Sequence, residues 1–476
     1  MTDYQNGTTL TDAKGMGGII AQDGFDYQVW DVIVRLPGWL LDPAFEGLIS
    51  EGLEDLEARF FAPHAPHGHL LNRYQAKSGT LTRGELIKVF NSFLLFDKKF
   101  PKVARVHALV TPALPKELEW IGRDPARVHR ARPFYQPFPD VCNASNQKLR
   151  EDLVEEFGAE IGGFFADFID IELRTFHDRA TAEVMFSSNI LEAFPNLNFN
   201  QRRFPAAFSA LFDLIAKERG SMLSKKRLIE VIEEALGLGL MLKENLCLHL
   251  RSDHNHLPPG TIEIDASGFS GIDGIFPTSQ TWLSNLVPPL QSAANWARLR
   301  NHQRIELSGA YRLSTAFTVG WSFRSTLGFE LNIPIRSGVW ATDEHPSVPA
   351  QQPPWAMHIP KRLVNGRLVV SIGVLRDPKE DVKTYLGLSE DEDILIATLS
   401  IPLAAGVEAQ ASVQAIKFAV AQAVSQFQPA GIDLFFVGPA ALAVALGHRW
   451  NALPSTQLYE FLATDRRYVP TVVLAN

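Results

Sequence analysis

The spacing of hydrophobic residues in the first 140 positions predicts a mixed region of helix and strand. Apolar side chains recur at helical spacing from Gly24 to Leu36, and Pro37 is expected to end that helix. Hydrophobic and polar residues then alternate from Asp55 to Phe60 and again from Leu70 to Lys77, which is the pattern of half-buried strands. A short apolar run at Val106 to Val110 adds a further strand.

The pattern changes near residue 146. Apolar residues recur at helical spacing from Leu149 to Phe168 and from Lys225 to Leu238, and Ser224 is a favourable N-cap for the second run. The stretch from Leu257 to Ser279 is rich in Gly, Pro and Ser. We therefore predict a helical region over residues 146–256 and a linker over residues 257–280.

Strands and helices alternate over the last 200 residues, and this order predicts a parallel sheet covered by helices. The expected strands are the apolar runs Leu368–Val374, Ile394–Ile401, Leu434–Val437 and Thr471–Leu474, and the expected helices are Ser412–Phe427 and Ala440–Arg449.

Composition places the chain among ordinary globular proteins. It has 476 residues, of which 46% are hydrophobic and 21% charged, which excludes a collagen, a coiled coil or a wholly disordered chain. Its two cysteines, Cys142 and Cys247, exclude a disulfide framework and a four-cysteine zinc site. The amino terminus has no apolar signal segment, and the longest apolar run, Leu434 to Gly447, is too short to span a bilayer. We expect a cytoplasmic protein with no membrane partner.

Charge is unevenly distributed along the chain. Residues 1–72 hold 3 basic and 11 acidic side chains, whereas residues 73–150 hold 15 basic and 6 acidic ones. The net charge of −8 excludes a uniformly basic coat, but an acidic segment followed by a basic one can place carboxylates beside a phosphate-binding face. Within the basic segment, Lys98, Lys99 and Lys102 are our candidates for DNA contact.

Polar residues at the ends of two neighbouring predicted strands form the strongest candidate for catalytic chemistry. Asp55 begins one strand, and Gln75 and Lys77 share one face of the next. The Asp55 carboxylate and the Gln75 amide oxygen are ligands suited to Mg²⁺ or another divalent cation. Lys77 can orient a water and offset charge on a phosphate, and Glu51 lies nearby in sequence.

These residues and their neighbours resemble the restriction-endonuclease-like PD-(D/E)xK fold, and more narrowly the nuclease domain at the front of bacterial antiphage effectors. That family often has Gln at its last acidic position, and it places a Glu or Gln on a helix before the catalytic strand. Gln28 or Glu51 could fill the helical role, and the resemblance leaves open whether Gln28, Glu51 or Glu54 is the additional catalytic or metal-site residue. The matching motifs are Gly17-Gly18-Ile19-Ile20, Gly24-Phe25-x-Tyr27-Gln28, Glu51-x-x-Glu54-Asp55 and Gln75-x-Lys77.

A second set of motifs resembles the SAVED domain, the cyclic-oligonucleotide sensor of CBASS antiphage signalling. The resemblance implies two fused CARF-like halves, each a Rossmann-type sheet, over residues 281–476. Its motifs are Ile305-x-Leu-x-Gly309-x-x-Arg312, Phe317-x-x-Gly320-x-x-Phe323-Arg324, Val339-Trp340, Phe435-Phe-Val-Gly438-Pro439 and Tyr468-Val-Pro470.

Chemistry suggests which residues of this domain contact a ligand. Parallel sheets bind ligands at the carboxyl ends of their strands, where Gly438-Pro439 precedes a helix. Bases need aromatic faces and phosphates need donors. The candidates are Arg312, Trp321, Phe323, Arg324, Trp340, Lys361, Arg376, Gly438 and Pro439.

Taken together, the sequence predicts an α/β multidomain protein. It comprises a restriction-endonuclease-like nuclease (residues 1–145), a helical region (146–256), a linker (257–280) and a SAVED domain (281–476). The resemblance implies a metal-dependent endonuclease that cuts double-stranded DNA with little sequence specificity. A cyclic oligonucleotide from a partner nucleotidyltransferase would activate it by driving assembly of a homo-oligomer. Two alternatives are a nucleotide-binding signalling protein with a non-catalytic front domain and a conventional restriction endonuclease.

Overall fold

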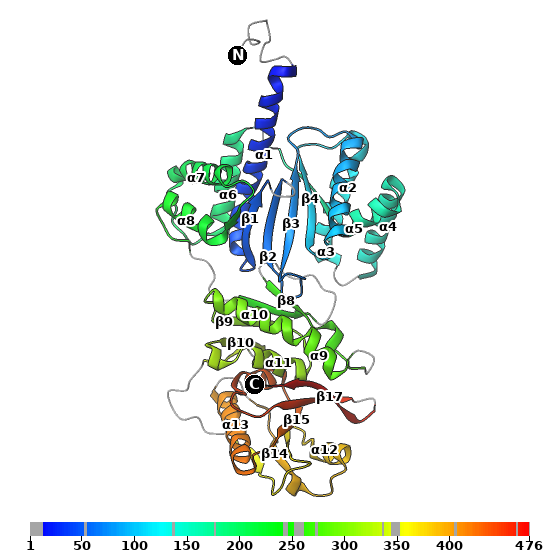
Figure 1. The fold of residues 1–476 in the computed structure, drawn as a ribbon, viewed down its shortest axis with the longest axis vertical. Helices are drawn as coiled ribbons and strands as arrows, with labels where there is room; N and C mark the ends of the chain where they lie inside the picture. The colour runs from blue at the N-terminus through cyan, green and yellow to red at the C-terminus, as the bar shows by residue number, and fades with distance from the viewer. Residues whose placement is uncertain are drawn as a thin grey trace. The chain divides into compact units, whose positions relative to one another are not determined.

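The computed structural model describes residues 13–51, 55–135, 139–175, 178–240, 246–251, 261–271, 275–335, 338–343, 353–403, 407–462 and 465–475 (Figure 1). Glu54, one of the candidates for the additional catalytic residue, lies outside them, as do the side chains of residues 13–22. The chain divides into two compact units, residues 1–242 and 243–476, and each is described separately below.

A six-stranded sheet with the order β5-β4-β3-β2-β1-β6 forms the centre of the first unit. Strands β1, β2 and β3 pair antiparallel, whereas β3, β4 and β5 are parallel. The carboxyl ends of β1, β3, β4 and β5 and the amino end of β2 therefore meet at one edge, called here the carboxyl edge of the first sheet. The strands are β1 (Phe45–Ser50), β2 (Leu56–Phe61), β3 (His69–Ala76), β4 (Ala104–Thr111), β5 (Ile169–Leu173) and β6 (Met222–Ser224).

Helices cover both faces of this sheet. Trp39 of α1 (Ala13–Leu41) packs on the Tyr74 ring of β3, which places α1 on one face. Successive residues of a strand point to opposite faces, so Arg73 and Gln75 point away from α1. On their side, apolar residues of α2 (Arg83–Lys99) and α5 (Ala159–Phe168) form a core with Leu109 of β4.

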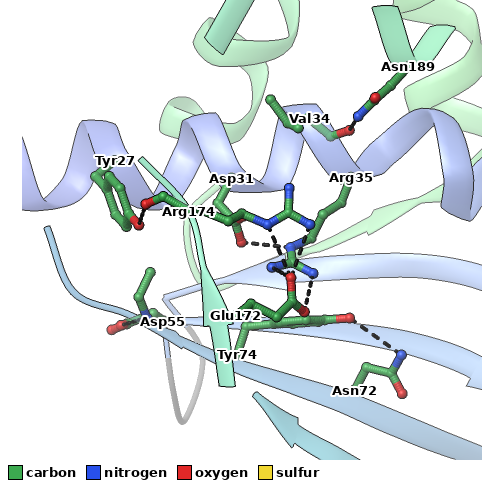
Figure 2. Close-up of polar contacts among 11 residues, drawn as sticks. Tyr27, Asp31, Val34, Arg35, Asp55, Asn72, Tyr74, Glu172, Arg174 and Asn189 are labelled. Atoms are coloured by element: carbon green, nitrogen blue, oxygen red, sulfur yellow. Dashed lines mark hydrogen bonds and ion pairs between the residues drawn. The ribbon is translucent and has the colours of Figure 1, made fainter. Parts of the chain in front are cut away.

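The prediction that the first helix ends at Pro37 is wrong, because α1 continues through it to Leu41. A proline inside a helix removes one hydrogen bond and displaces the carbonyl groups of the preceding turn. In that turn the Val34 carbonyl accepts a hydrogen bond of 2.8 Å from the Asn189 side chain of α6 (Figure 2). Asn189 thus binds a carbonyl next to that of Ile33, which is the one that Pro37 leaves without its helical N–H donor.

The region after residue 145 is helical, but it is not separate from the first sheet. Strand β5 is its outer strand beyond β4, and β6 pairs with β1. The five residues of β5 follow α5 directly, so no turn signal marks this strand in the sequence. Helix α4 (Pro139–Phe157) leads into this region, which also contains α6 (Arg179–Ala193), α7 (Phe204–Lys217) and α8 (Lys225–Leu236), and α3 (Trp120–Tyr135) precedes it.

The second unit contains two further sheets, each largely parallel. The second sheet has the order β11-β10-β9-β7-β8 and the third has the order β12-β14-β13-β15-β16-β17. Their strands are β7 (Leu246–Arg251), β8 (Thr261–Asp265), β9 (Arg304–Gly309), β10 (Glu330–Ile335), β11 (Gly338–Ala341), β12 (Ala356–His358), β13 (Arg367–Val374), β14 (Ile394–Leu399), β15 (Gly431–Val437), β16 (Thr456–Leu462) and β17 (Arg467–Leu474).

The structure corrects the predicted linker over residues 257–280. Strand β8 lies inside it and pairs with β7, which is a central strand of the second sheet. The alternating Thr261-Ile-Glu-Ile-Asp265 is a strand pattern that the surrounding Gly, Pro and Ser residues conceal. The second unit therefore begins near residue 243 rather than at residue 281.

Two helices of the second unit, one from each half, pack closely against each other. In α11 (Leu313–Ser322) and α14 (Ala440–Arg449), Gly320 and Gly447 occupy equivalent positions, 447 − 320 = 127 residues apart. A Cβ on Gly320 would lie 1.9 Å from the Val444 carbonyl oxygen, and one on Gly447 would lie 2.1 Å from that of Phe317. Because each glycine meets the matching residue of the other helix, the contact has local two-fold symmetry. The remaining helices of this unit are α9 (Ser279–Asn285), α10 (Val287–Leu299), α12 (Lys379–Leu386) and α13 (Val407–Phe427).

Candidate functional site

Asp55 and Gln75 lie opposite each other at the carboxyl edge of the first sheet. The β2–β3 register pairs Leu56 with Tyr74, and one step further it places Asp55 across from Gln75. The Asp55 carboxylate accepts a hydrogen bond of 2.8 Å from the backbone N–H of Ala76. The predicted hairpin thus brings these two side chains together on adjacent strands.

The Gln75 side chain has a feature that suits a metal ligand. Its amide oxygen is buried and has no hydrogen-bond partner among the described residues. Leaving such an atom unpaired costs about 1–3 kcal/mol, so native proteins rarely do so without a reason. A divalent cation held by this oxygen and the Asp55 carboxylate would satisfy it. No group of three or more His, Cys, Asp or Glu residues that could hold a metal occurs within the described part of the chain.

Lys77 continues the β3 ladder, since its backbone N–H donates to the Val110 carbonyl at 2.8 Å. Its side chain is half-buried. Glu51 also lies at this edge, where its N–H donates to the Asp55 carbonyl at 2.9 Å, but its exposed carboxylate is paired with Arg219 at 3.6 Å. Gln28 lies on α1, which covers the opposite face of the sheet.

The next cross-strand pair behind this site is a buried ion pair. Glu57 and Arg73 lie opposite each other 3.6 Å apart, and the Arg73 guanidinium lies 3.4 Å from the ring centre of Phe96 on α2. Arg73 also donates at 3.3 Å to the His107 ring, whose pKa is lowered to about 3 by burial and then by Arg73 itself. His107 is therefore neutral and accepts this bond, so α2 and β4 are fixed beneath the pair.

On the other face of the sheet, a charged network holds α1 against β5. Arg35 of α1 binds both oxygens of Glu172 at 2.8 Å and one oxygen of Asp31 at 2.7 Å (Figure 2). Burial alone would raise the pKa of Glu172, but Arg35 and Arg174 together lower it below its ordinary value. The Tyr27 hydroxyl donates to the Arg174 carbonyl at 2.9 Å, directly after β5. These contacts lie on the α1 face of the sheet, opposite to the face toward which Gln75 points.

The lysines proposed for DNA contact lie away from this edge. Helix α2 runs from the carboxyl end of β3 back to the amino end of β4, and Lys98 and Lys99 are its last two residues. A helix of 17 residues is about 25 Å long, so these lysines and Lys102 lie at the far end of the sheet. Lys98 is moreover paired with Glu160. Exposed basic residues nearer to the carboxyl edge include Arg83 and Lys88 on the first turns of α2, Lys116 after β4 and Arg219, which pairs with Glu51.

In the second unit, the structure brings together part of the predicted ligand set. Arg376 follows β13, and Gly438-Pro439 follows the neighbouring parallel strand β15. A Cβ on Gly438 would lie 3.2 Å from Val374, two residues before Arg376. Arg312, the residue that precedes α11, lies in the same region, because Ser314 of α11 contacts Glu460 near the end of β16.

The other predicted ligand residues lie elsewhere. Phe323 is fully buried against Phe329, and Trp321 and Trp340 are also in the core, so none of these rings offers a face to a ligand. Trp321, Phe323 and Arg324 are at the carboxyl-terminal end of α11, opposite to Arg312. Lys361 precedes β13 and is therefore on the side of its amino end. Spacing along the sequence does not reveal this, because burial depends on which elements pack together.

Sequence reasoning missed Glu460, whose carboxylate accepts a hydrogen bond of 2.6 Å from the backbone N–H of Ser314. It acts as a cap for α11, since the Arg312 side chain makes no capping bond. Burial raises the pKa of Glu460, and its bonds to Ser314 oppose that shift. The alternation of Thr456 to Leu462 could have revealed strand β16, but not this contact over 146 positions.

Comparison with known proteins relates the carboxyl-terminal half of the chain to sensor domains. Residues 290–474 match the family model described as SAVED, the "SMODS-associated and fused to various effectors sensor domain". The prediction of a SAVED domain at the carboxyl end is confirmed by this match.

The similarity to individual proteins extends over the whole chain. The chain is 25% identical over 484 aligned positions to CD-NTase-associated protein 4 of Moraxella osloensis, covering 98% of this chain and 99% of that protein. A protein of the same name from Acinetobacter sp. (strain ATCC 27244 / 9458) is 24% identical over 473 positions, with the same coverage of both.

Solved structures share the fold. The Acinetobacter baumannii Cap4 SAVED/CARF-domain containing receptor with the cyclic trinucleotide 2'3'3'-cAAA matches at a TM-score of 0.74 and 22% identity, over 95% of this chain and 99% of that one. The Moraxella osloensis Cap4 receptor matches at 0.71 and 22%, over 96% and 100%. The α/β multidomain architecture expected from the sequence is thereby confirmed. Among the described residues, no helix is both long and apolar enough to cross a membrane.

Proposed function

We propose that this protein is an antiphage effector of the CBASS type, a metal-dependent endonuclease that cuts double-stranded DNA with little sequence specificity after binding a cyclic oligonucleotide. The observation that carries the nuclease proposal is the cross-strand pair of Asp55 and Gln75, since the Gln75 amide oxygen is buried and has no hydrogen-bond partner in the described part of the chain. Lys77 lies two residues beyond Gln75 at the same edge. This is the donor set that the PD-(D/E)xK resemblance requires.

Each residue has a distinct part in the proposed reaction. Mg²⁺ or a similar cation supplies Lewis-acid chemistry and a nucleophilic water when bound. Asp55, fixed by its bond to the Ala76 N–H, and Gln75 would hold the cation. Lys77 brings a positive charge to the phosphate on which negative charge develops. The neutral His107 and the Glu57–Arg73 pair beneath them keep β3 and β4 in register.

The sensor proposal rests on the SAVED match and on the Cap4 receptor solved with cyclic trinucleotides. In this chain Arg376 and the Gly438-Pro439 turn lie at adjacent strand ends, where parallel sheets bind ligands. A partner nucleotidyltransferase would supply the messenger. Binding would drive the chain into a homo-oligomer, which brings two nuclease sites to the two DNA strands.

A plasmid-cleavage assay with a cyclic trinucleotide and Mg²⁺ tests the nuclease proposal. Lys77→Ala and Asp55→Asn should each lower the cleavage rate at least about 100-fold, because they remove charge that acts on the phosphate or the cation. Chelation of the metal should abolish cleavage by the unaltered protein. Asn at position 55 keeps an oxygen that accepts the Ala76 bond, so the hairpin should remain folded.

Lys226→Ala is a suitable control, since this side chain is 88% exposed on α8. Its cleavage rate should equal that of the unaltered protein. Full cleavage by Lys77→Ala would contradict the assignment of this site. Ligand binding without cleavage under any metal condition would favour a signalling protein with a non-catalytic front domain.

A further inference from the structure

Aromatic rings gather at the carboxyl edge of the third sheet, on the face that α12 covers. Tyr468 of β17 lies at their centre, with its ring 4.9 Å from Phe435, 5.1 Å from Phe461 and 6.1 Å from Tyr385. Tyr468 and Phe461 are paired across β16 and β17, near the carboxyl end of β16. Phe461 is only partly buried, so the cluster reaches the surface at this edge.

The Tyr468 hydroxyl is buried but lacks the hydrogen bond that buried hydroxyls usually make, as far as the described residues go. The residue is 1% exposed, and its hydroxyl has no partner among the described residues. Burial raises the pKa of Tyr468, and the next charged groups that act on it are Asp381 and Arg376. Both follow β13, so the hydroxyl lies near the sheet edge at which parallel strands end. The hydroxyl of a buried tyrosine usually has a hydrogen-bond partner.

The turn after β13 positions Arg376 above these rings. Its guanidinium lies 5.0 Å from the ring centre of Phe461, is paired with Asp381, and is 52% exposed. Leu375 before it adopts φ 64° with its side chain 64% exposed, an unfavourable conformation and environment for leucine. Gly373 permits this turn, since a Cβ there would lie 2.2 Å from the Arg376 carbonyl oxygen. Strain of this kind concentrates at functional sites.

We propose that Phe461, Tyr468 and Arg376 form a nucleobase subsite at the carboxyl edge of the third sheet. A base stacks on the Phe461 ring, which Arg376 now covers, and the Tyr468 hydroxyl gains its missing hydrogen bond from the base. The Arg376 guanidinium, released from Phe461, turns to the adjoining phosphate. This inference rests on the proposed sensor function and adds two residues, Phe461 and Tyr468, that ligand chemistry and spacing did not identify.

Calorimetric titration of the full chain with 3′3′3′-linked cyclic tri-adenylate tests the subsite. Tyr468→Phe removes only the unpaired hydroxyl and should weaken binding about tenfold with no loss of thermal stability. Phe461→Leu keeps an apolar side chain but removes the stacking face, and should weaken binding by a similar or larger factor. Because the Tyr468 hydroxyl has no hydrogen-bond partner among the residues that the structure describes, Tyr468→Phe should keep the fold, and misfolding does not explain a weaker affinity.

Tyr459→Phe is the matched control. It is the same chemical change in the same aromatic cluster, but this hydroxyl already bonds to Asp433 at 3.3 Å, so ligand affinity should stay within about twofold. Unchanged affinity in both Tyr468→Phe and Phe461→Leu, with binding by the unaltered protein, would overturn the subsite and leave the sensor proposal standing. Absence of binding by the unaltered protein would overturn both.

Discussion

At the scale of single residues, Gln75 should affect both the stability of the metal-free protein and the binding of a cation. One substitution can test both effects. Its buried amide oxygen has no partner among the described residues, which lowers stability, and the same oxygen is available to a cation. Gln75→Met keeps the length of the side chain and removes the polar atoms. Without metal, this variant should melt a few degrees higher than the unaltered protein, because the cost of the unpaired group disappears.

Adding Mg²⁺ should then raise the melting temperature of the unaltered protein and leave that of Gln75→Met nearly unchanged. Differential scanning calorimetry with and without Mg²⁺ measures both effects. Equal stabilisation of the two proteins by Mg²⁺ would show that Gln75 is not a metal ligand. The test does not depend on cleavage, so it remains informative if the DNA substrate is unsuitable.

The sequence predicted the placement of Asp55, Gln75 and Lys77 better than that of the proposed ligand residues, for a physical reason. Asp55, Gln75 and Lys77 lie on one hairpin, where alternation and register determine which side chains meet. The predicted stacking residues Trp321 and Trp340 belong to elements whose exposure depends on distant partners, and they are in the core. The local sequence pattern therefore placed Asp55, Gln75 and Lys77 at one edge. It could not show that Trp321 and Trp340 are buried.

At the scale of elements, the direction of α2 determines which lysines could meet DNA at the carboxyl edge of the first sheet. Lys88 on its first turns and Lys116 after β4 are exposed near that edge, whereas Lys98 and Lys102 are at the far end. Charge reversal at Lys88 and Lys116 should weaken DNA binding more than the same change at Lys98 and Lys102, since contacts with phosphates release counterions.

Binding of a short duplex at several salt concentrations distinguishes the two pairs of variants. The Lys88/Lys116 double variant should show a shallower dependence of affinity on salt than the unaltered protein. If the Lys98/Lys102 double variant shows the larger effect, DNA follows the opposite edge of the sheet, and the original sequence-based assignment of these lysines is correct.

At the scale of the whole molecule, the boundary between the two units decides which fragments fold. Residues 243–476 include all strands of the second and third sheets, whereas residues 281–476 lack β7 and β8. Because β7 lies between β8 and β9, its loss would leave one side of β9 without backbone partners. The longer fragment should be soluble and unfold cooperatively, and the shorter one should aggregate or remain unfolded.

Circular dichroism and thermal melting of the two purified fragments compare them directly. A stable, cooperative fragment 281–476 would contradict the boundary at residue 243. The sequence predicted the SAVED domain at the carboxyl end, but not this boundary, because β8 lies in a Gly- and Ser-rich stretch typical of linkers. Its strand character depends on pairing with β7, which is a property of the assembled sheet.

The contact between α11 and α14 also bears on how such a chain can diverge. Two identical subunits that paired through this glycine contact would carry every substitution twice, once in each partner. With both partners in one polypeptide, each position varies independently. The residues that precede the two helices already differ, with Arg312 before α11 and Pro439 before α14. The two halves of such a binding surface can carry different residues at equivalent positions. The surface can therefore match a molecule whose two sides differ.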